Sequence, residues 1–358
     1  MTARYVVRFA LGAGIVAGLL GTPTPAGAFQ AKTTPAAKAG PKAPAQKAGR
    51  TTTAVASKPT PTRSSLARAR AAAAARARLA VAARAAREQR DVMTPRFKRD
   101  LLGNLVPDVR AAAAIVFNPA SGEVLWEENS RAQLSIASIT KVMTSVVFMA
   151  DAPDLSQKVA VVAADTRRAS TTHLRAGQIV SYDDLMHLLL MASDNAAARA
   201  LARTSEGGSA AFISRMNEMA AHLNLPSTYY TDPSGLESTN VSSAFDLAHL
   251  IAFAATDPII GPIMRTEKYQ VQTNTGVIGI HSTNRLLGTD VDVRGGKTGF
   301  IRKAGYCLAT LLQLPTGNQV AVVVLGAAKS TTRFWEARHL FNWVVGRAPG
   351  IPGGENRD

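Results

Sequence analysis

The sequence contains a single cysteine, Cys307, among its 358 residues. One thiol excludes an intramolecular disulfide, and no group of Cys and His residues has the spacing of a zinc site, so we predict neither a metal nor another cofactor. Cys307 lies in a strand-like run of residues, where a small buried hydrophobic side chain is a simpler interpretation than a thiol nucleophile. The fold must therefore be stabilised by its hydrophobic core, for which the chain is long enough.

Acidic residues are scarce in the first hundred positions. Residues 1–100 contain 19 of the 41 Lys and Arg residues but only 3 of the 25 Asp and Glu residues, which accounts for the whole formal net charge of +16. The rest of the chain is formally neutral, so a basic nucleic-acid-binding domain is not predicted. A DNA-compacting protein with a basic tail is the remaining nucleic-acid alternative, and the neutral folded domain and the export signal predicted at residues 1–28 both argue against it.

Long apolar runs are absent after the first residues. At the start, Arg4 and Arg8 precede an apolar stretch at 9–21, and small residues follow at 26–28. This order is typical of a secretory signal peptide, so we predict cleavage before Phe29 and export to the periplasm or cell-wall space. The apolar stretch is shorter than the roughly 20 residues that span a bilayer, which argues against an uncleaved anchor.

Large apolar residues are also scarce between the signal and the folded domain. Residues 29–62 are mostly Ala, Lys, Pro, Thr and Gly, a composition that predicts a disordered tether. Ala and Arg dominate residues 64–90, where a solvated helix is expected. A functional alternative is that this basic tail, 29–100, binds anionic wall polymers or a membrane surface. The folded domain is predicted at 101–348, with a flexible end at 349–358.

Strand signals lie at both ends of this domain and helical periodicity lies between them. The strand-like runs are residues 111–117, 123–127, 306–312 and 319–325. Turn sequences separate the members of each pair, the stretch 182–223 is mostly helical, and an amphipathic helix is expected at 332–345. The pattern predicts an α+β fold with one antiparallel sheet assembled from both ends of the domain and an inserted helical lobe.

Three short motifs contain side chains capable of chemistry. Ser138 precedes Lys141 by three positions, residues 193–195 are Ser, Asp and Asn, and residues 297–299 are Lys, Thr and Gly. Each motif is common by itself. Their ordered combination is typical of class A β-lactamases and penicillin-binding proteins.

Ser138 and Lys141 are expected on one face of a helix because residues three apart are neighbours there. A serine hydroxyl needs a base, and a desolvated lysine near another cation has a lowered pKa and can accept the proton. We predict Ser138 as the nucleophile and Lys141 as the general base. In isolation, the two residues would be a helix cap and a surface lysine.

The other two motifs are expected to complete the site. Ser193 is predicted to transfer a proton to the leaving amine, and Asn195 to orient Lys141 and the substrate, although this segment could be a simple helix cap. Lys297 and Thr298 are predicted to bind the substrate. Gly299 lacks a side chain, so a substrate backbone can lie against its strand.

With residues 231–236 and 240–247, these motifs resemble the D-alanyl-D-alanine carboxypeptidase and endopeptidase family of low-molecular-mass penicillin-binding proteins. The resemblance covers about residues 105–346 and implies the penicillin-binding protein/β-lactamase-like transpeptidase fold. It also implies an acyl-enzyme mechanism, with backbone N–H groups of Ser138 and Phe300 as the oxyanion hole. The implied substrates are stem peptides of peptidoglycan, and the implied covalent inhibitors are β-lactams.

The phrases around the motifs most resemble the D-alanyl-D-alanine endopeptidase branch of that family. Only 59 residues follow Gly299, so the C-terminal β-rich domain and amphipathic helix of many carboxypeptidases are not expected. We predict hydrolysis of D-Ala cross-links, with release of terminal D-Ala as the alternative. Residues 232–235 are implied to shape the fold beside the site.

Two other classes share part of this pattern. A class A β-lactamase needs a glutamate that positions the deacylating water, and no Glu-x-x-Leu-Asn sequence lies between Ser193 and Lys297. An inactive wall-binding protein is the non-enzymatic alternative, and the intact motifs argue against it. The histidines that could suggest a Ser-His pair are His173, His249 and His281. None is assigned a catalytic role, because a lysine base needs no histidine.

Overall fold

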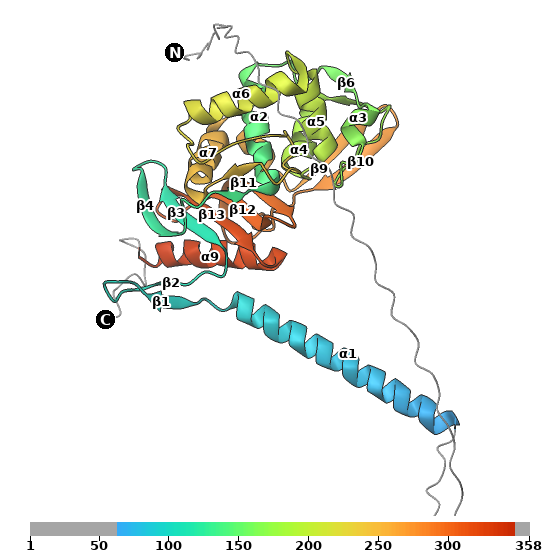
Figure 1. Cartoon of the computed structure of the whole chain (residues 1–358), viewed down its shortest axis with the longest axis vertical. Coiled ribbons are helices and arrows are strands. Elements are labelled where there is room, and N and C mark those ends of the chain that lie inside the picture. Colours follow the sequence, from blue (N-terminus) through green and yellow to red (C-terminus); the bar gives the residue numbers. More distant parts are fainter. Residues whose placement is uncertain (1–62, 348–358) are drawn as a thin grey trace, which may run out of the picture. The chain divides into compact units, whose positions relative to one another are not determined.

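The computed structural model describes residues 63–347 (Figure 1). The predicted signal peptide at 1–28, the tether at 29–62 and the C-terminal end at 349–358 lie outside the described residues. Within the described range, no helix combines the length and the hydropathy needed to cross a bilayer. No group of three or more His, Cys, Asp or Glu side chains in that range is arranged to hold a metal ion.

A five-stranded antiparallel sheet with the order β11-β12-β13-β3-β4 forms the framework (Figure 1). Its strands are β3 (Ala113–Asn118), β4 (Glu123–Glu128), β11 (Asp292–Ile301), β12 (Gly305–Gln313) and β13 (Gln319–Ala327). The two ends of the domain meet where β13 pairs with β3, with Val323 opposite Ile115. The predicted sheet, built from both ends of the domain, is confirmed.

The helical lobe is inserted between β4 and β11, as predicted. After the short 3-10 helix η1 (Ala137–Ile139), its helices are α2 (Thr140–Ala150), α3 (Ala163–Thr166), α4 (Tyr182–Leu190), α5 (Asn195–Thr204), α6 (Gly208–His222), α7 (Ala244–Thr256) and α8 (Ile260–Arg265). Three small antiparallel pairs accompany them: β5 (Leu134–Ser135) with β8 (Val241–Ser242), β6 (Lys158–Ala160) with β7 (Ile179–Ser181), and β9 (Lys268–Thr273) with β10 (Gly276–His281).

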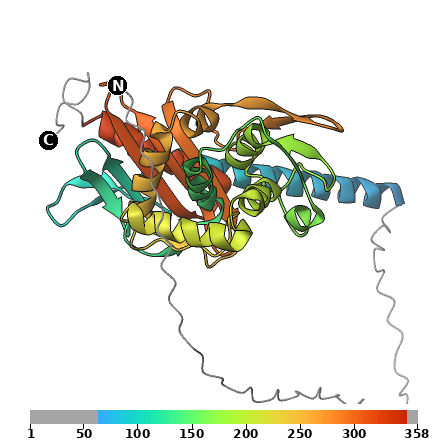
Figure 2. The same ribbon diagram turned by 90° about the horizontal axis from the view of Figure 1, so that it is seen from above.

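Helices cover both faces of the large sheet. α9 (Ser330–Val345) packs on one face, and α7 packs on the other within the helical lobe (Figure 1). From above, the green and yellow helices lie over the orange and red strands (Figure 2). Side chains alternate accordingly, with Val323 in the core on the α7 side and Val322 in the core on the α9 side. Burial on both faces explains why the central strands are almost continuously hydrophobic.

The elements before the sheet are a helix and a hairpin. α1 (Arg63–Met93) has mostly exposed side chains, and β1 (Phe97–Arg99) pairs with β2 (Leu105–Pro107), so the predicted domain start at residue 101 falls inside this hairpin. The last turn of α1 contacts the rest of the described chain. Val92 is buried, and His339 Nε2 on α9 lies 2.9 Å from the carbonyl oxygen of Met93.

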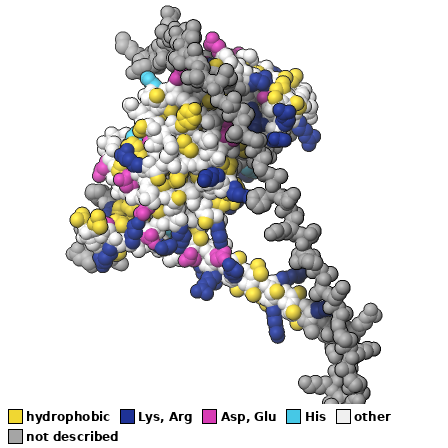
Figure 3. Space-filling model, in the orientation of Figure 1, with side chains coloured by type: hydrophobic (Ala, Val, Ile, Leu, Met, Phe, Trp, Pro, Cys, Tyr) yellow, Lys and Arg dark blue, Asp and Glu magenta, His cyan; other side chains and the backbone are white. Residues whose placement is uncertain are grey.

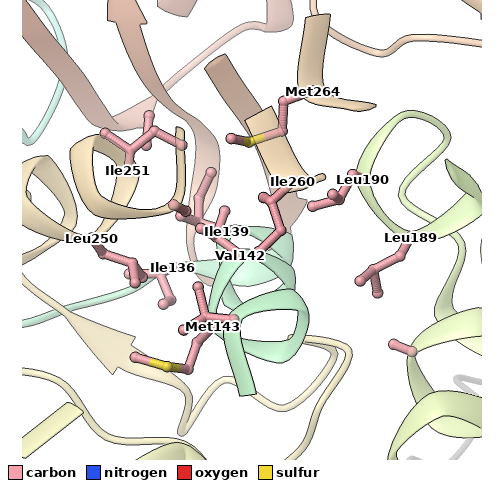
Figure 4. Packing of buried hydrophobic residues seen from close by; sticks show 14 of the residues in the cluster. Ile136, Ile139, Val142, Met143, Leu189, Leu190, Leu250, Ile251, Ile260 and Met264 are labelled. Atoms are coloured by element: carbon pink, nitrogen blue, oxygen red, sulfur yellow. The ribbon is translucent and has the colours of Figure 1, made fainter. Parts of the chain in front are cut away.

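α2 lies at the centre of the helical lobe. Its side chains Val142 and Met143 are fully buried among residues of α4, α7 and α8 (Figure 4). Its N-terminal end meets the edge strand β11 so closely that a Cβ on Gly299 would lie 2.8 Å from the carbonyl oxygen of Ile136. The sheet edge can approach this end of α2 only because residue 299 has no side chain.

A second glycine, Gly235, allows a loop to contact the same turn. It has φ +78°, and a Cβ there would lie 2.1 Å from the carbonyl oxygen of Ala137. A side chain could not be accommodated without moving one of the two backbones. The start of α2 is therefore held between β11 and the loop that contains Gly235.

We expect Gly235→Ala to destabilise the fold more than a matched glycine substitution. Gly177 also has positive φ (+89°), but no atom would lie within 4 Å of its Cβ. Gly177→Ala should therefore cost only the conformational penalty, about 1 kcal/mol. Gly235→Ala should cost roughly 2 kcal/mol more because of the backbone clash. Urea denaturation of both variants measures the difference, and equal losses would contradict the inferred packing.

Candidate functional site

The structure brings all three predicted motifs together where the start of α2, the loop between α4 and α5, and strand β11 meet. Lys141 Nζ lies 3.1 Å from Ser138 Oγ, which links the two residues of the first motif. Lys297 Nζ on β11 donates to Ser193 Oγ at 2.8 Å, which links the second and third motifs. The segments that meet here are distant in sequence, so the site depends on the assembled lobe and sheet.

Lys141 is fully buried and has three oxygen neighbours. Its Nζ donates to Asn195 Oδ1 at 2.6 Å and to the carbonyl oxygen of Ser234 at 2.5 Å, and the third neighbour is Ser138 Oγ. A neutral lysine has two N–H groups and one lone pair. The two acceptors match the two N–H groups, which leaves the lone pair for the Ser138 hydroxyl.

The pKa of Lys141 is shifted in the direction that a base requires. Burial lowers this pKa to about 7, and the negative charges of Asp232 and Asp194 oppose the shift. The positive charge of Arg199 lowers the pKa further. A substantial fraction of Lys141 is therefore neutral near pH 7 and can accept a proton.

Ser138 lies in η1, immediately before α2, and is half-buried. The preceding residue, Ala137, has φ +49°, which is unusual for a residue with a side chain. Thr140 Oγ1 donates to the carbonyl oxygen of Ala137 at 2.8 Å and holds this turn. The hydroxyl of Ser138 is thus presented by a turn that its neighbours keep in a strained conformation.

The loop between α4 and α5 is fixed by its two buried polar residues. Asp194 is the N-cap of α5 and accepts from the backbone N–H of Ala197 at 3.0 Å. Asn195 Nδ2 donates to the carbonyl oxygen of Ala169 at 2.6 Å, which orients its Oδ1 toward Lys141. Ser193 itself has φ +59°. The loop therefore serves as the helix cap that the sequence alone allowed, while two of its side chains reach the lysines.

Lys297 is the second buried lysine. Besides Ser193, it donates to the carbonyl oxygen of Thr298 at 2.8 Å. Burial lowers the pKa of Lys297 well below its ordinary value, and the positive charges of Lys141 and Arg333 lower it further. Thr298 Oγ1 donates to Thr283 Oγ1 at 2.7 Å. The two buried lysines thus bring Ser138 and Ser193 into one hydrogen-bonded site.

The loop 232–237 contributes a contact that the sequence analysis did not assign. Asp232 Oδ1 accepts from the backbone N–H groups of Ser234 and Gly235 at 2.6 and 2.9 Å. Asn240, fully buried, donates to Thr140 Oγ1 at 3.0 Å and to the carbonyl oxygen of Asp232 at 2.8 Å. These bonds aim the carbonyl of Ser234 at Lys141. A backbone acceptor has no side-chain signal in the sequence.

Arg333 on α9 was also not predicted. Its Nη1 donates to the carbonyl oxygens of Gly299 and Cys307, at 2.9 and 3.1 Å, and only 7 % of the residue is exposed. Burial lowers the pKa of Arg333 to about 10, so it remains charged at neutral pH. The sequence predicts an amphipathic helix at 332–345. An arginine that faces inward cannot be told from the exposed charged residues of such a helix by its pattern alone.

The three histidines have other surroundings. His173 Nδ1 lies 3.4 Å from Asp194 Oδ2, and a hydrogen bond with Asp194 raises the pKa of His173. His249 packs against the ring of Phe117. His281 ends β10 and is exposed. In the described part of the chain, the base in contact with Ser138 is Lys141.

A groove at the end of β11 gives room for an extended ligand. It has a volume of about 810 Å³, and its lining includes Ser135, Ser238, Phe300 and Arg302. Phe300 is half exposed, and its ring stacks on Tyr306 with centroids 4.1 Å apart. An extended peptide bound along β11 would continue into this groove.

Relatives with curated names match this chain over most of its length. The D-alanyl-D-alanine endopeptidase of Pseudomonas aeruginosa is 32% identical over 254 residues, which cover 69% of this chain and 82% of the relative. The D-alanyl-D-alanine endopeptidase of Escherichia coli is 30% identical, and the match covers 69% of this chain and 81% of the relative. The D-alanyl-D-alanine carboxypeptidase DacC of the same organism is 34% identical, and the match covers 66% of this chain and 62% of the relative.

Solved structures of the same kind share the fold. A D-alanyl-D-alanine carboxypeptidase from Mycobacterium tuberculosis superimposes with a TM-score of 0.63 and 28% identity, covering 68% of this chain and 94% of the other. The Streptomyces K15 DD-transpeptidase superimposes with a TM-score of 0.63 and 27% identity, covering 66% of this chain and 97% of the other. The sequence profile of the D-alanyl-D-alanine carboxypeptidase family matches residues 102–329. The chain therefore belongs to this family of serine hydrolases, and its α+β fold is that of the penicillin-binding DD-peptidases.

Proposed function

We propose that the protein is an exported, penicillin-sensitive D-Ala-D-Ala endopeptidase that hydrolyses D-Ala cross-links in peptidoglycan through an acyl-enzyme on Ser138. The observation that carries the proposal is the surroundings of Lys141 Nζ. Two oxygen acceptors occupy its N–H groups, burial lowers its pKa to about 7, and Ser138 Oγ lies 3.1 Å away. This arrangement supports Lys141 as the base that activates Ser138.

In the acylation step, Ser138 Oγ attacks the D-Ala carbonyl carbon while its proton moves to Lys141. The oxygen of the tetrahedral intermediate is stabilised by the backbone N–H groups of Ser138 and Phe300. Ser193, in contact with Lys297, relays a proton to the nitrogen of the leaving amine as its bond to the carbonyl carbon breaks. Water then attacks the ester and releases the D-Ala carboxylate, and Ser138 regains its proton.

The remaining predicted residues bind the substrate in this proposal. Asn195 orients Lys141 and the substrate amide, and Thr298 contacts the peptide beside Lys297. The peptide backbone lies against β11 as an added strand, and Gly299 lets β11 approach the turn that contains Ser138. A β-lactam would enter the same site, where Ser138 opens its amide bond and remains acylated.

Support for an endopeptidase over a carboxypeptidase comes from the relatives. Those of P. aeruginosa and E. coli are named D-alanyl-D-alanine endopeptidases, and the match covers about four fifths of each. The catalytic groups do not separate the two reactions, since both attack a D-Ala carbonyl. Carboxypeptidase activity, the release of terminal D-Ala, is the second candidate, supported by the family profile itself.

Export and attachment form a separate part of the proposal. Residues 1–28 have the pattern of a signal peptide, and residues 29–87 contain 13 Lys and Arg residues without an acidic one. In the exported protein, this basic tail binds anionic wall polymers or lipid headgroups by screened attraction. Peptidoglycan is thus the substrate of the domain, while the tail keeps the enzyme near it.

A fluorescent penicillin should label the wild-type protein covalently. Ser138→Ala should abolish the label because no nucleophile remains, and Lys141→Ala should lower the labelling rate by a factor of at least about 10³ because the base is lost. His281→Ala, at the exposed end of β10, leaves both residues and their contacts intact, so it is the matched control and should label normally. Gel fluorescence measures the rates. Persistent labelling of Ser138→Ala would refute the assignment.

The labelling rate should follow the protonation of Lys141. Below pH 7 it should rise about tenfold per pH unit as Lys141 loses its proton, and it should level off above the pKa. Asn195→Asp would place a carboxylate beside Nζ and stabilise the ammonium, so the rise should move to higher pH. Stopped-flow rates of acylation from pH 5 to 9 test this. A profile that is flat through pH 7 would exclude Lys141 as the base.

Substrate choice can be measured with purified muropeptides. We expect cross-linked dimers to be converted to monomers faster than terminal D-Ala is released from pentapeptide monomers. Chromatography of the products, with Ser138→Ala as the blank, gives both rates. If pentapeptides are trimmed while dimers survive, the carboxypeptidase candidate replaces the endopeptidase.

The tail can be tested by deleting residues 29–87, which leaves the contacts of Val92 and Met93 intact. The truncated protein should co-sediment less with cell-wall sacculi at low salt, since 13 positive charges are lost. The difference should disappear at about 0.5 M salt, where the screening length is only a few ångströms. Equal sedimentation at low salt would show that the tail does not attach the enzyme.

A further inference from the structure

A recess lined by arginines lies beside the catalytic residues and is not used by the proposed mechanism. It has a volume of about 630 Å³ and is lined by Ala164, Arg167, Arg168, Arg199, Leu236 and Glu237. Three of the six lining residues are arginines, and one is acidic. In the space-filling view, Lys and Arg side chains gather at the upper right, over the end of the helical lobe that contains α3 (Figure 3).

The arginines of the recess are not neutralised by the described residues. None of the three forms an ion pair with a described carboxylate, whereas Arg203, one turn further along α5, pairs with Asp165 at 2.9 Å. Arg199 Nη1 donates instead to the backbone carbonyl oxygens of Asp165 and Arg167, at 3.2 and 2.7 Å. Unlike Arg203, these guanidinium groups remain available to an external anion.

Backbone contacts connect the recess to Lys141 on two sides. Arg199 is one helical turn after Asn195, and Ala169, which follows Arg168, accepts from Asn195 Nδ2. Leu236 and Glu237 belong to the same loop as Ser234, whose carbonyl oxygen accepts from Lys141. Residues that line the recess are therefore close in sequence to both groups that accept hydrogen bonds from Lys141.

The position of the recess indicates which part of a substrate can reach it. Ser193 and Lys297 are on the side of Lys141 where the proposed leaving amine departs. On the other side, Glu237 lines the recess and the next residue, Ser238, lines the groove at the end of β11, so a peptide that continues from β11 into this groove passes beside the recess. Groups on the acyl side of the scissile bond, rather than the leaving group, therefore approach the arginines.

We propose that this recess is a subsite for free carboxylates on the acyl side of the D-Ala peptide, with Arg167 and Arg168 as the specificity-determining residues. The inference rests on the proposed function and names the substrate class, an acidic peptide. Arginine suits this role because its guanidinium forms paired hydrogen bonds with a carboxylate. The recess therefore favours anionic ligands. The carboxylate of Glu237 repels the same ligands and so weakens their binding.

The test compares two synthetic peptides that end in D-Ala-D-Ala and differ only in acyl-side carboxylates or the matching carboxamides. Wild-type protein should hydrolyse the carboxylate peptide with the lower KM and a similar kcat, because a remote contact is made equally in the ground state and the transition state. The double variant Arg167→Gln/Arg168→Gln should raise this KM about fivefold, as expected for exposed charge pairs, and leave the carboxamide peptide unchanged.

Two single variants separate the recess from a general charge effect. Glu237→Gln removes the opposing charge and should lower the KM for the carboxylate peptide. Arg175→Gln removes one positive charge, half of what the double variant removes, at an exposed position outside the recess, and should leave both KM values unchanged. Equal KM values for the two peptides with wild-type protein, or equal effects of Arg175→Gln and the double variant, would overturn the proposal.

A binding measurement keeps this test independent of the proposed activity. Calorimetric titration of Ser138→Ala with both peptides reports recognition without turnover. The proposed function is judged separately, by cleavage of cross-linked muropeptides, and it fails if wild-type protein cleaves neither these nor the two peptides. A carboxylate preference in binding that the double variant abolishes would still support the subsite, and its absence would refute it.

Discussion

The contact between the buried amine of Lys141 and its two oxygen acceptors is the interaction on which the site depends. A lysine taken out of water loses much of its tendency to be protonated, and here burial lowers its pKa to about 7. Asn195 Oδ1 and the Ser234 carbonyl oxygen accept hydrogen bonds from the two N–H groups of the neutral amine. The lone pair of the nitrogen is then left for the hydroxyl of Ser138. Without both acceptors, a neutral lysine would have no preferred orientation toward the serine.

Much of the surrounding structure maintains this contact. Asp194 caps α5 and thereby positions Asn195. Asp232 accepts hydrogen bonds from backbone N–H groups of the loop that contains Ser234, and so fixes the direction of its carbonyl. Both carboxylates bond to backbone and lie near Lys141 without contacting it, so they moderate the fall in its pKa and do not hold its proton. Gly299 and Gly235 let β11 and the loop approach the turn before α2.

Positive charge accumulates around Ser138. Arg333 is buried on the β11 side, and Arg199 lies one turn beyond Asn195 on the helical side. Such an arrangement favours anions, both the oxyanion that forms during acylation and carboxylates of a peptide substrate. The proposed carboxylate subsite extends this electrostatic character from the reaction centre to the recognition of the acyl chain.

The sequence by itself determined the class of fold and the chemical groups of the site, because both leave local patterns. Apolar runs separated by turn residues marked the strands of the sheet, and Ser138 with Lys141, Ser193 with Asn195, and residues 297–299 are contiguous or helically spaced motifs. Only the tertiary structure decided how they meet. The Ser234 carbonyl, the guanidinium of Arg333 and the recess around Arg167 depend on contacts between segments distant in sequence. Such contacts leave no periodic or motif signal, since a backbone carbonyl or a surface arginine looks the same wherever the fold places it.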